Sequence, residues 1–186
     1  MKSLALLALA LLALLASACA GGAAAGSDDG RLTIVTTTGQ IGDTARIVGG
    51  DHVRVLSLMG PGTDPHLYVA GISDVDKLRS ADVVFYNGLF LEAQMDAVLE
   101  QLAERQTVIA VSAGIDPAEL LPSAAYADEF DPHIWFDVRL WMQTVEQVRD
   151  TLMAVDPAHA ADYEANAAAY LAELAELDAY VAAQAA

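Results

Sequence analysis

The sequence predicts an α/β fold, in which a four-stranded parallel sheet is flanked by helices and followed by one long helix. Two observations support this prediction. Between residues 31 and 112, short runs of β-branched residues alternate with stretches of helical periodicity, and strands joined by helical crossovers run parallel. After residue 137, apolar residues recur at spacings of three and four, which is typical of long amphipathic helices.

The first two strands and the helix between them follow from periodicity and glycine positions. Residues 32–38 (LTIVTTT) form a β-branched run typical of a buried strand, and Gly39 ends it. In residues 40–48 the apolar side chains lie on one helical face, and two glycines stop the helix. Residues 52–59 (HVRVLSLM) are the second predicted strand, and they lead into the loop GPGTDPHLY, residues 60–68.

The third and fourth strands repeat this pattern. A helix through Val75 and Leu78 leads to the third predicted strand, residues 82–87 (DVVFYN). A second helix over residues 91–104 leads to the fourth, residues 107–112 (TVIAVS). Because helices separate all four strands, each crossover returns the chain to the same edge of the sheet, and the sheet is predicted to be parallel.

A long loop and two helices complete the predicted order. Residues 113–132 form a loop of about twenty residues, which is long enough to indicate a functional loop. Asp137 is suited to cap the next helix. Asp156 and Pro157 are suited to open the last one, because proline is tolerated at the first helical position. A helix over residues 156–186 would be about 45 Å long.

Both C-terminal helices have an apolar stripe, and we expect both tryptophans, Trp135 and Trp141, to lie in the core. A stripe along so long a helix indicates a packing partner larger than the four-stranded unit. We therefore expect the sequence to cover the first half of a two-lobed protein. The alternative is a one-domain protein whose last helix folds back on its own sheet.

The amino terminus has the pattern of an export signal. Residues 1–19 carry a positive charge at Lys2, continue with an unbroken apolar run from Leu4 to Ala16 and end with small residues around Cys19. The apolar run is shorter than the roughly 20 residues of a membrane-spanning helix. Residues 16–19 (ASAC) resemble a bacterial lipobox, in which the cysteine is acylated, so Cys19 is the predicted lipid anchor and residues 20–31 a flexible tether. An ordinary cleaved signal with an incidental cysteine is the alternative.

The composition excludes some classes of protein. Acidic residues outnumber basic ones 26 to 9, giving a net charge of −17. A polyanion such as nucleic acid would be repelled by this charge, so no nucleic-acid partner is expected. The chain has 1 cysteine, which excludes an intrachain disulfide.

The tripeptide Asp-Pro-His occurs twice, ending at His66 and at His133. Both copies follow strands at the carboxyl edge of the predicted sheet, where open α/β sheets bind ligands. The proline fixes its own φ and restricts the aspartate before it, so each histidine is presented rigidly. A neutral imidazole is a favoured ligand of Zn²⁺ and is accepted by Mn²⁺ and Fe²⁺, so both histidines are predicted metal ligands. His52 and His159 are interpreted as surface or structural residues without a matching partner.

Four segments in this order, TTTGQIGD, GGDHVRVLSLMGPGTDPHLY, ADVVFYNGLFLE and DPHIWFDVRLW, resemble the zinc/manganese solute-binding proteins of bacterial ABC importers, which include TroA-like and adhesin-type lipoproteins. The resemblance runs from about Leu32 to the last residue. It implies two α/β lobes joined by a rigid helix, with the metal between them and its first two ligands at His66 and His133. Residues 32–155 would form the N-terminal metal-binding lobe and residues 156–186 the linking helix. The second lobe, with a histidine or glutamate as third ligand and an aspartate as fourth, would be absent from this sequence.

The chain also departs from the family pattern. Relatives often carry a histidine after NGL, where this chain has Phe90, although that histidine is not a ligand that the resemblance carries over. Zinc-selective relatives frequently have a histidine- and acid-rich insertion before the second ligand. The corresponding residues 118–130 (AELLPSAAYADEF) contain no histidine, which disfavours a dedicated zinc scavenger.

The resemblance implies an exported receptor, in the periplasm or at the outer face of the cytoplasmic membrane, that does no catalysis. It would capture Zn²⁺ or Mn²⁺ as cargo for an ABC permease and its ATPase. With two protein ligands, the chain is expected to bind metal at micromolar or weaker affinity. One alternative is a metal-dependent hydrolase using Asp64, Asp131 and Asp137, although HExxH and a nucleophile elbow are both missing from the sequence. The other alternative is a surface adhesin.

Overall fold

The structure is a computed structural model that describes residues 30–124 and 126–185. The predicted signal peptide with its lipobox-like Cys19, and the predicted tether as far as residue 29, lie outside the described residues. Within the described ranges, no helix combines the length and the apolar character needed to cross a membrane.

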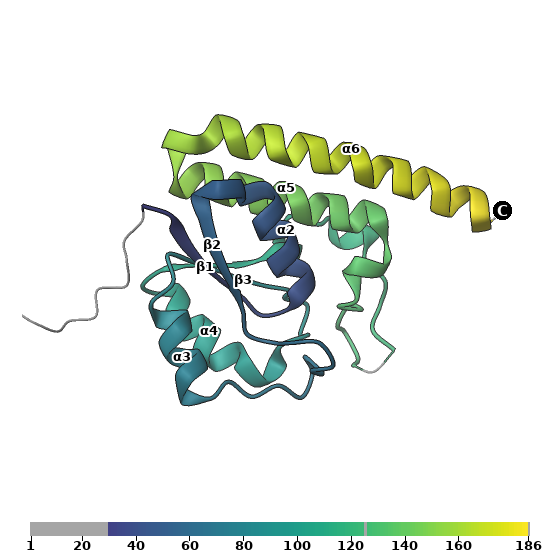
Figure 1. Cartoon of the computed structure of the whole chain (residues 1–186). Coiled ribbons are helices and arrows are strands. Elements are labelled where there is room, and N and C mark those ends of the chain that lie inside the picture. Colours follow the sequence, from purple (N-terminus) through teal and green to yellow (C-terminus); the bar gives the residue numbers. More distant parts are fainter. Residues whose placement is uncertain (1–29, 125, 186) are drawn as a thin grey trace, which may run out of the picture. The chain divides into compact units, whose positions relative to one another are not determined.

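The core of the fold is a parallel sheet of four strands in the order β2-β1-β3-β4 (Figure 1). The strands are β1 (Leu32–Thr36), β2 (Val53–Ser57), β3 (Val83–Tyr86) and β4 (Thr107–Ala110). Strand β1 pairs in parallel with β2 and β3, and β3 pairs in parallel with β4. The predicted fold class is confirmed. The strand order reverses between β1 and β3, which is the place where doubly wound sheets gather their ligand-binding loops.

The helices fill the predicted gaps, with short 3₁₀ turns at several of their ends. The α-helices are α2 (Gly39–Gly49), α3 (Ile72–Arg79), α4 (Asp96–Ala103), α5 (Val138–Val155) and α6 (Ala160–Ala185). The 3₁₀ turns are η2 (Gly50–His52), η3 (Ala93–Met95), η4 (Val111–Gly114), η5 (Pro117–Glu119), η6 (Ile134–Phe136) and η7 (Pro157–His159). The helix predicted over residues 91–104 is therefore split into η3 and α4, and the last helix begins with the turn η7.

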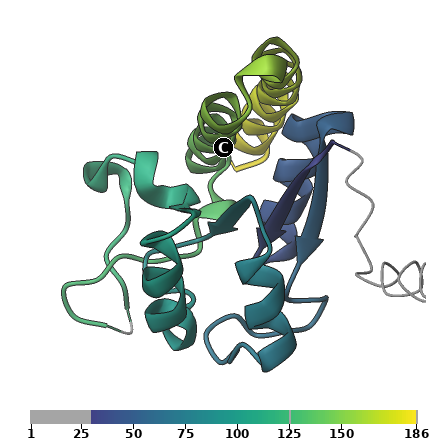
Figure 2. The ribbon, with the colours of Figure 1, turned by 90° about the vertical axis from the view of Figure 1, so that its left-hand side faces the viewer.

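The sheet is covered by helices on both faces because its central strands alternate their buried side chains. Ile34 and Phe85 point into a core that contains the apolar stripes of α2, α5 and α6. Val35 and Val84 are the sequence neighbours of Ile34 and Phe85, so their side chains point to the opposite face of the sheet. There they form a second core with Met59 and residues of α3 and α4. Figures 1 and 2 show α5 and α6 side by side on one side of the sheet, and α3 and α4 on the other.

The last helix is buried along one side as far as Leu174. Tyr163, Ala167 and Leu174 are buried in the core shared with α2 and α5. Leu177, Tyr180 and Val181 continue the same stripe, but between 45% and 62% of each of these residues is exposed. Figure 1 shows the C-terminal end of α6 extending past α5. The apolar stripe of α6 is thus only partly covered by the described residues.

The start of α6 is held by the carboxylate of Asp156. Its Oδ2 accepts a hydrogen bond from the Tyr163 hydroxyl at 2.6 Å and lies 2.6 Å from His159 Nδ1. The Tyr163 hydrogen bond, together with His159 and against the opposing effect of burial, lowers the pKa of Asp156. A carboxyl group with a lowered pKa stabilises the fold above its unfolded pKa, and this stabilisation is lost as the pH falls through the folded value.

Tyr163→Phe is therefore expected to lower the free energy of unfolding by about 1–2 kcal/mol at neutral pH, because a hydrogen bond to a charged group is lost. The difference from the wild type should begin to shrink as the pH falls below the unfolded pKa of about 3.9 and should be lost as the pH falls through the lowered folded pKa of Asp156. Urea unfolding of both chains from neutral to acidic pH measures it. Tyr170→Phe is the control, since the Tyr170 hydroxyl has no hydrogen bond among the described residues. A pH-independent difference would contradict this role of Asp156.

Candidate metal centre

The two Asp-Pro-His histidines meet at the carboxyl edge of the sheet. His66 lies on the loop after β2, and His133 precedes η6 at the end of the long loop after β4. Their Nε2 atoms are 3.4 Å apart, and their ring planes are inclined by 54°. Two Zn–N bonds of about 2.0–2.1 Å at a tetrahedral angle place their nitrogens about 3.3–3.4 Å apart. The spacing of the two imidazoles therefore fits two ligands of one ion.

Each Asp-Pro-His folds into the same local turn. Asp64 Oδ1 accepts the backbone N–H of His66 at 2.9 Å, and Asp131 Oδ1 accepts that of His133 at 3.0 Å. An aspartate that bonds the amide two residues later forms an Asx turn, and the proline between them stiffens it. The repeated tripeptide thus builds one kind of histidine presentation twice, on two loops that are far apart in sequence.

The ring of His133 is also oriented by Asp131. Its Nδ1 lies 2.6 Å from Asp131 Oδ1. The backbone amide and then the ring of His133 lower the pKa of Asp131, which keeps this carboxyl group ionised. An ionised carboxylate at Nδ1 selects the tautomer with the proton on that nitrogen, so the lone pair of Nε2 faces His66. Carboxylates commonly orient metal-binding histidines in this way.

The loop that carries His66 is anchored by Tyr68. The Tyr68 hydroxyl donates to Asp74 Oδ2 at 2.8 Å, near the start of α3. Burial, followed by this bond, raises the pKa of Tyr68 to about 12. The hydrogen bonds that Asp74 accepts from Lys77 and from Tyr68 lower the pKa of Asp74 against the effect of burial. The hydrogen bond therefore persists across the physiological pH range and ties the His66 loop to α3.

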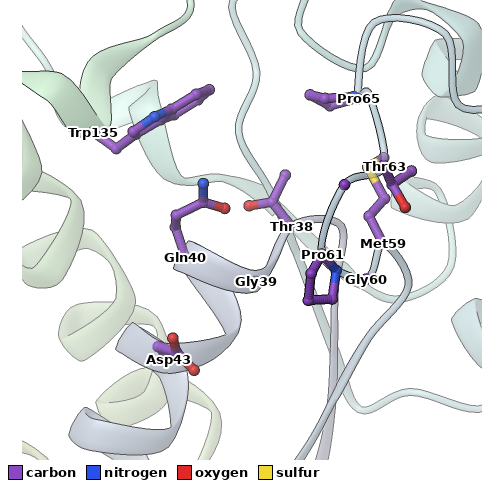
Figure 3. A pocket seen from close by; sticks show the side chains of 11 residues that line it. Thr38, Gly39, Gln40, Asp43, Met59, Gly60, Pro61, Thr63, Pro65 and Trp135 are labelled. Carbon is purple, nitrogen blue, oxygen red and sulfur yellow. The ribbon is translucent and has the colours of Figure 1, made fainter.

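Two cavities flank the histidine pair. One, of about 280 Å³, is lined by both histidines and by the apolar side chains of Leu89, Phe90 and Tyr126. The other, of about 360 Å³, lies between the start of α2, the loop before His66 and Trp135. Figure 3 shows Gln40 and Thr38 between Trp135 on one side and Pro65 on the other. The histidine pair thus lines the first cavity, and the second is lined by Trp135, which contacts His133, and by Pro65, which precedes His66.

The two tryptophans have different environments. Trp141 is 7% exposed and belongs to the core, as predicted. Trp135 is half-buried and packs against the edge of the same core, and its ring centroid lies 5.2 Å from that of His133, so its prediction as a core residue is met only in part. It belongs to η6 rather than to the stripe of α5, and the turn places it beside the site.

His52 and His159 also form a pair, which the sequence interpretation missed. Their rings stack with centroids 3.9 Å apart and an interplanar angle of 18°. His52 Nε2 lies 2.8 Å from Asp162 Oδ2, and His159 contacts Asp156. Nearly parallel rings cannot aim their in-plane lone pairs at one ion. These two histidines therefore join η2 to the start of α6, in line with the structural role predicted for them.

The loop after β3, residues 87–92 (NGLFLE), was given no role by the sequence analysis. Gly88, Leu89 and Phe90 have φ values of 81°, 53° and 66°, a conformation that costs a non-glycine residue about 1–2 kcal/mol. The buried carboxylate of Glu92 accepts bonds from the backbone N–H groups of Asn87 and Gly88. The signal in the sequence was a glutamate in an otherwise apolar segment. The left-handed turn itself has no signal beyond Gly88.

The described part of the chain supplies this histidine pair and no larger donor set. Across residues 30–124 and 126–185, no group of 3 or more histidine, cysteine, aspartate or glutamate side chains could hold a metal ion. Structural zinc sites use four protein ligands. Within these ranges, the candidate donor set for one ion is thus the pair His66 and His133.

The chain is similar to proteins that handle metal ions. Residues 34–186 match the family described as ZnuA, zinc-uptake complex component A, periplasmic. The manganese-binding lipoprotein MntA of Bacillus subtilis is 43% identical over 160 residues, 86% of this chain and 52% of that protein. The zinc-binding protein TroA of Treponema pallidum is 41% identical over 153 residues, 82% of this chain and 49% of that protein.

Solved structures give the same result. The periplasmic zinc-binding protein TroA from Treponema pallidum matches with a TM-score of 0.78, and the match covers 82% of this chain and 54% of the TroA chain. Zn(II)-bound AdcA from Streptococcus pneumoniae is 34% identical and matches with a TM-score of 0.74. This match covers 81% of this chain and 32% of the AdcA chain. The chain spans about half the length of the curated relatives it matches. Because the family model matches residues 34–186, which is most of the chain, the chain belongs to the ZnuA family.

Proposed function

We propose that the chain is part of an extracytoplasmic receptor that captures Zn²⁺ or Mn²⁺ and delivers it to the permease and ATPase of an ABC importer. The observation that supports this function is the 3.4 Å distance between the Nε2 atoms of His66 and His133. The names of the relatives agree with it: they include a manganese-binding lipoprotein, a zinc-binding protein and a manganese ABC transporter substrate-binding lipoprotein.

Capture would depend on two imidazoles that are already in place. Asx turns hold both histidines, and Asp131 orients the ring of His133, so little conformational freedom is lost when the ion binds. The ion is cargo and not a resident cofactor. Binding therefore has to be reversible, and ligands contributed by a separate part of the protein would allow the ion to be released when the two parts move.

The remaining ligands would come from a second lobe. In this proposal residues 32–155 form the first lobe, and residues 156–186 form the helix that links it to the second. The exposed Leu177, Tyr180 and Val181 would pack there, which agrees with the apolar stripe that the described residues leave partly uncovered. The greater length of the relatives supports this organisation.

The location follows from the amino terminus. An export signal at residues 1–19 would carry the protein across the cytoplasmic membrane, and acylation of Cys19 would anchor it to the outer face. Several relatives are named lipoproteins, which supports the anchor. A net charge of −17 gives no attraction to nucleic acid. In this proposal the partners are the permease and ATPase of the importer and, through the lipid anchor, the membrane.

Catalysis is not part of this proposal. The relatives are named as metal-binding or substrate-binding proteins. Of the acids that a hydrolase would need, Asp64 and Asp131 accept the backbone amides of the two histidines, and Asp137 caps α5 through Arg139 N at 2.9 Å. No feature of the described residues favours the adhesin alternative. All three aspartates of the hydrolase alternative therefore have structural roles in the proposed receptor.

Calorimetric titration of the chain with Zn²⁺ and with Mn²⁺ tests the proposal. We expect one ion per chain and a dissociation constant in the micromolar range or weaker, because two neutral imidazoles hold only part of a coordination shell. Zn²⁺ should bind more tightly than Mn²⁺, since nitrogen ligands follow the Irving–Williams order. Nanomolar affinity would mean that this part of the protein holds further ligands. No binding of Zn²⁺ at millimolar concentration would refute the site.

A further inference from the structure

Glu92 is a buried acid with no part in the metal site itself. It is 1% exposed, at the end of the loop 87–92. Thr37 donates its hydroxyl to Oε1 at 2.6 Å, and the backbone N–H of Asn87 donates to the same oxygen at 2.8 Å. The N–H of Gly88 donates to Oε2 at 3.2 Å. Burying a carboxylate is costly, and these three donors, from two different strand ends, offset part of this cost, while burial still raises the pKa of Glu92.

One branch of this network leads to His133. The Asn87 side-chain amide donates to the carbonyl of Pro132 at 3.0 Å, and Pro132 directly precedes His133. The same amide donates to the carbonyl of Gly88 at 3.0 Å, which fixes its orientation, because a flipped amide would place an oxygen against two carbonyls. Asn87 is 1% exposed, and within the described ranges its Oδ1 has no hydrogen-bond partner. Leaving the Asn87 Oδ1 buried without a partner lowers the stability of the fold. The NH₂ of the same side chain holds the backbone before His133.

The other branch leads toward His66. The carbonyl of Thr37 accepts the backbone N–H of Met59 at 2.9 Å, and Met59 directly precedes the loop that carries His66. The N–H of Thr37 donates to the carbonyl of Phe85 in β3 at 3.1 Å. Thr37 thus ties the ends of three strands together, and its hydroxyl is held by Glu92. A single carboxylate therefore lies at the base of both histidine loops.

The network also holds the left-handed turn beside the site. Leu89 and Phe90 have positive φ values and line the cavity that contains both histidines. Such a turn persists only where its surroundings hold it. The bonds from Asn87 N and Gly88 N to Glu92 fix the residues that enter the turn, and Glu92 itself follows it.

We propose that Glu92 is a positioning residue for the metal site, which holds the His66 and His133 loops in place through Thr37 and Asn87. The proposal rests on the proposed function, because it assumes that both histidines bind the same ion. Glu92 does not touch the ion. It sets the distance between the two imidazoles before the ion arrives.

Glu92→Gln tests this proposal. It keeps the size of the side chain but replaces one oxygen acceptor by an NH₂ group that faces N–H or O–H donors. The affinity for Zn²⁺ should fall about 10- to 100-fold, the usual effect of losing an outer-shell partner of a metal ligand. The measurement is a titration with Zn²⁺ followed by NMR through the ring signals of His66 and His133. Glu104→Gln, an exposed glutamate at the end of α4, is the control and should change nothing.

A double-mutant cycle separates positioning from a general structural role. If Glu92 acts through the histidine pair, Glu92→Gln should weaken Zn²⁺ binding in the wild type but have no further effect in His133→Ala. Thr37→Val is nearly isosteric and removes one bond to the carboxylate. It should weaken binding about 3- to 10-fold, even if Glu92→Gln fails to fold. Reduced stability with unchanged Zn²⁺ affinity in the folded variants would overturn the proposal.

A measurement without metal distinguishes this proposal from the proposed function. In the metal-free chain, Glu92→Gln should speed hydrogen exchange of the Asn87 and Gly88 amides and should remove the contact between the His66 and His133 rings in NMR spectra. If the wild type bound no Zn²⁺, the proposed function would fail, but these signals would still show whether Glu92 positions the rings. If the amides and the ring contact are unchanged in the variant, the positioning role is refuted.

Discussion

His133→Ala is expected to weaken Zn²⁺ binding by the chain at least about 100-fold, which leaves the weak affinity of a single imidazole. The variant leaves one imidazole, His66, where the wild type has two Nε2 atoms 3.4 Å apart. It also leaves Asp131 without the ring that it orients. Titration calorimetry of the two chains under the same conditions measures the loss, and circular dichroism verifies that the variant is folded. His133 is 40% exposed at its side chain, so its removal should cost little stability.

The second histidine pair supplies a matched control. His159→Ala removes the same kind of side chain, but from a stacked pair whose rings cannot share an ion. Zn²⁺ affinity should stay within about twofold of the wild type, while the free energy of unfolding should fall by about 1 kcal/mol, the usual size of a ring-pair contribution. Equal losses of affinity in the two variants would mean that Zn²⁺ binding reports the state of the fold and not a site at His133.

Much of the fold follows from local patterns. The four strands are β-branched runs separated by helical stretches, and the parallel sheet follows because each crossover is a helix. The same argument predicts that loops after β2 and β4 lie at one edge, so the meeting of His66 and His133 is anticipated from topology together with the repeated Asp-Pro-His. In both cases the signal is local in sequence, and the helical crossovers determine that the strands run parallel and that their loops meet at one edge.

What the sequence does not reveal depends on distant contacts. Thr37 and Glu92 are 55 residues apart, and nothing in either segment predicts that they bond. The residues 91–104 have helical periodicity, yet the helix starts only at Asp96, because the left-handed Leu89 and Phe90 and a bond from Met95 N to Glu92 O delay it. The stacking of His52 on His159 is likewise a contact between separate elements. The pattern of apolar residues along the sequence does not predict such contacts between distant side chains.

The two tryptophans should give opposite phenotypes. Trp141→Ala removes a side chain in the core between α5 and the sheet, where the residue is 7% exposed, and should lower the free energy of unfolding by about 3–5 kcal/mol. Trp135→Ala removes a half-buried ring that lines the cavity and lies 5.2 Å from the His133 ring. It should cost about 1–2 kcal/mol, since truncation costs less where the site is partly open to solvent.

The effect on metal binding should be reversed. Trp135→Ala frees one side of the His133 ring, so Zn²⁺ affinity should fall about 3- to 10-fold, in the range of a lost aromatic contact. Trp141→Ala, measured at a temperature where the variant is folded, should bind Zn²⁺ like the wild type, because its ring contacts the core and not the histidines. Urea unfolding of the metal-free chains and Zn²⁺ titrations together make the comparison. If Trp135→Ala instead loses as much stability as Trp141→Ala while its affinity is unchanged, then Trp135 is a core residue and has no role beside the ion.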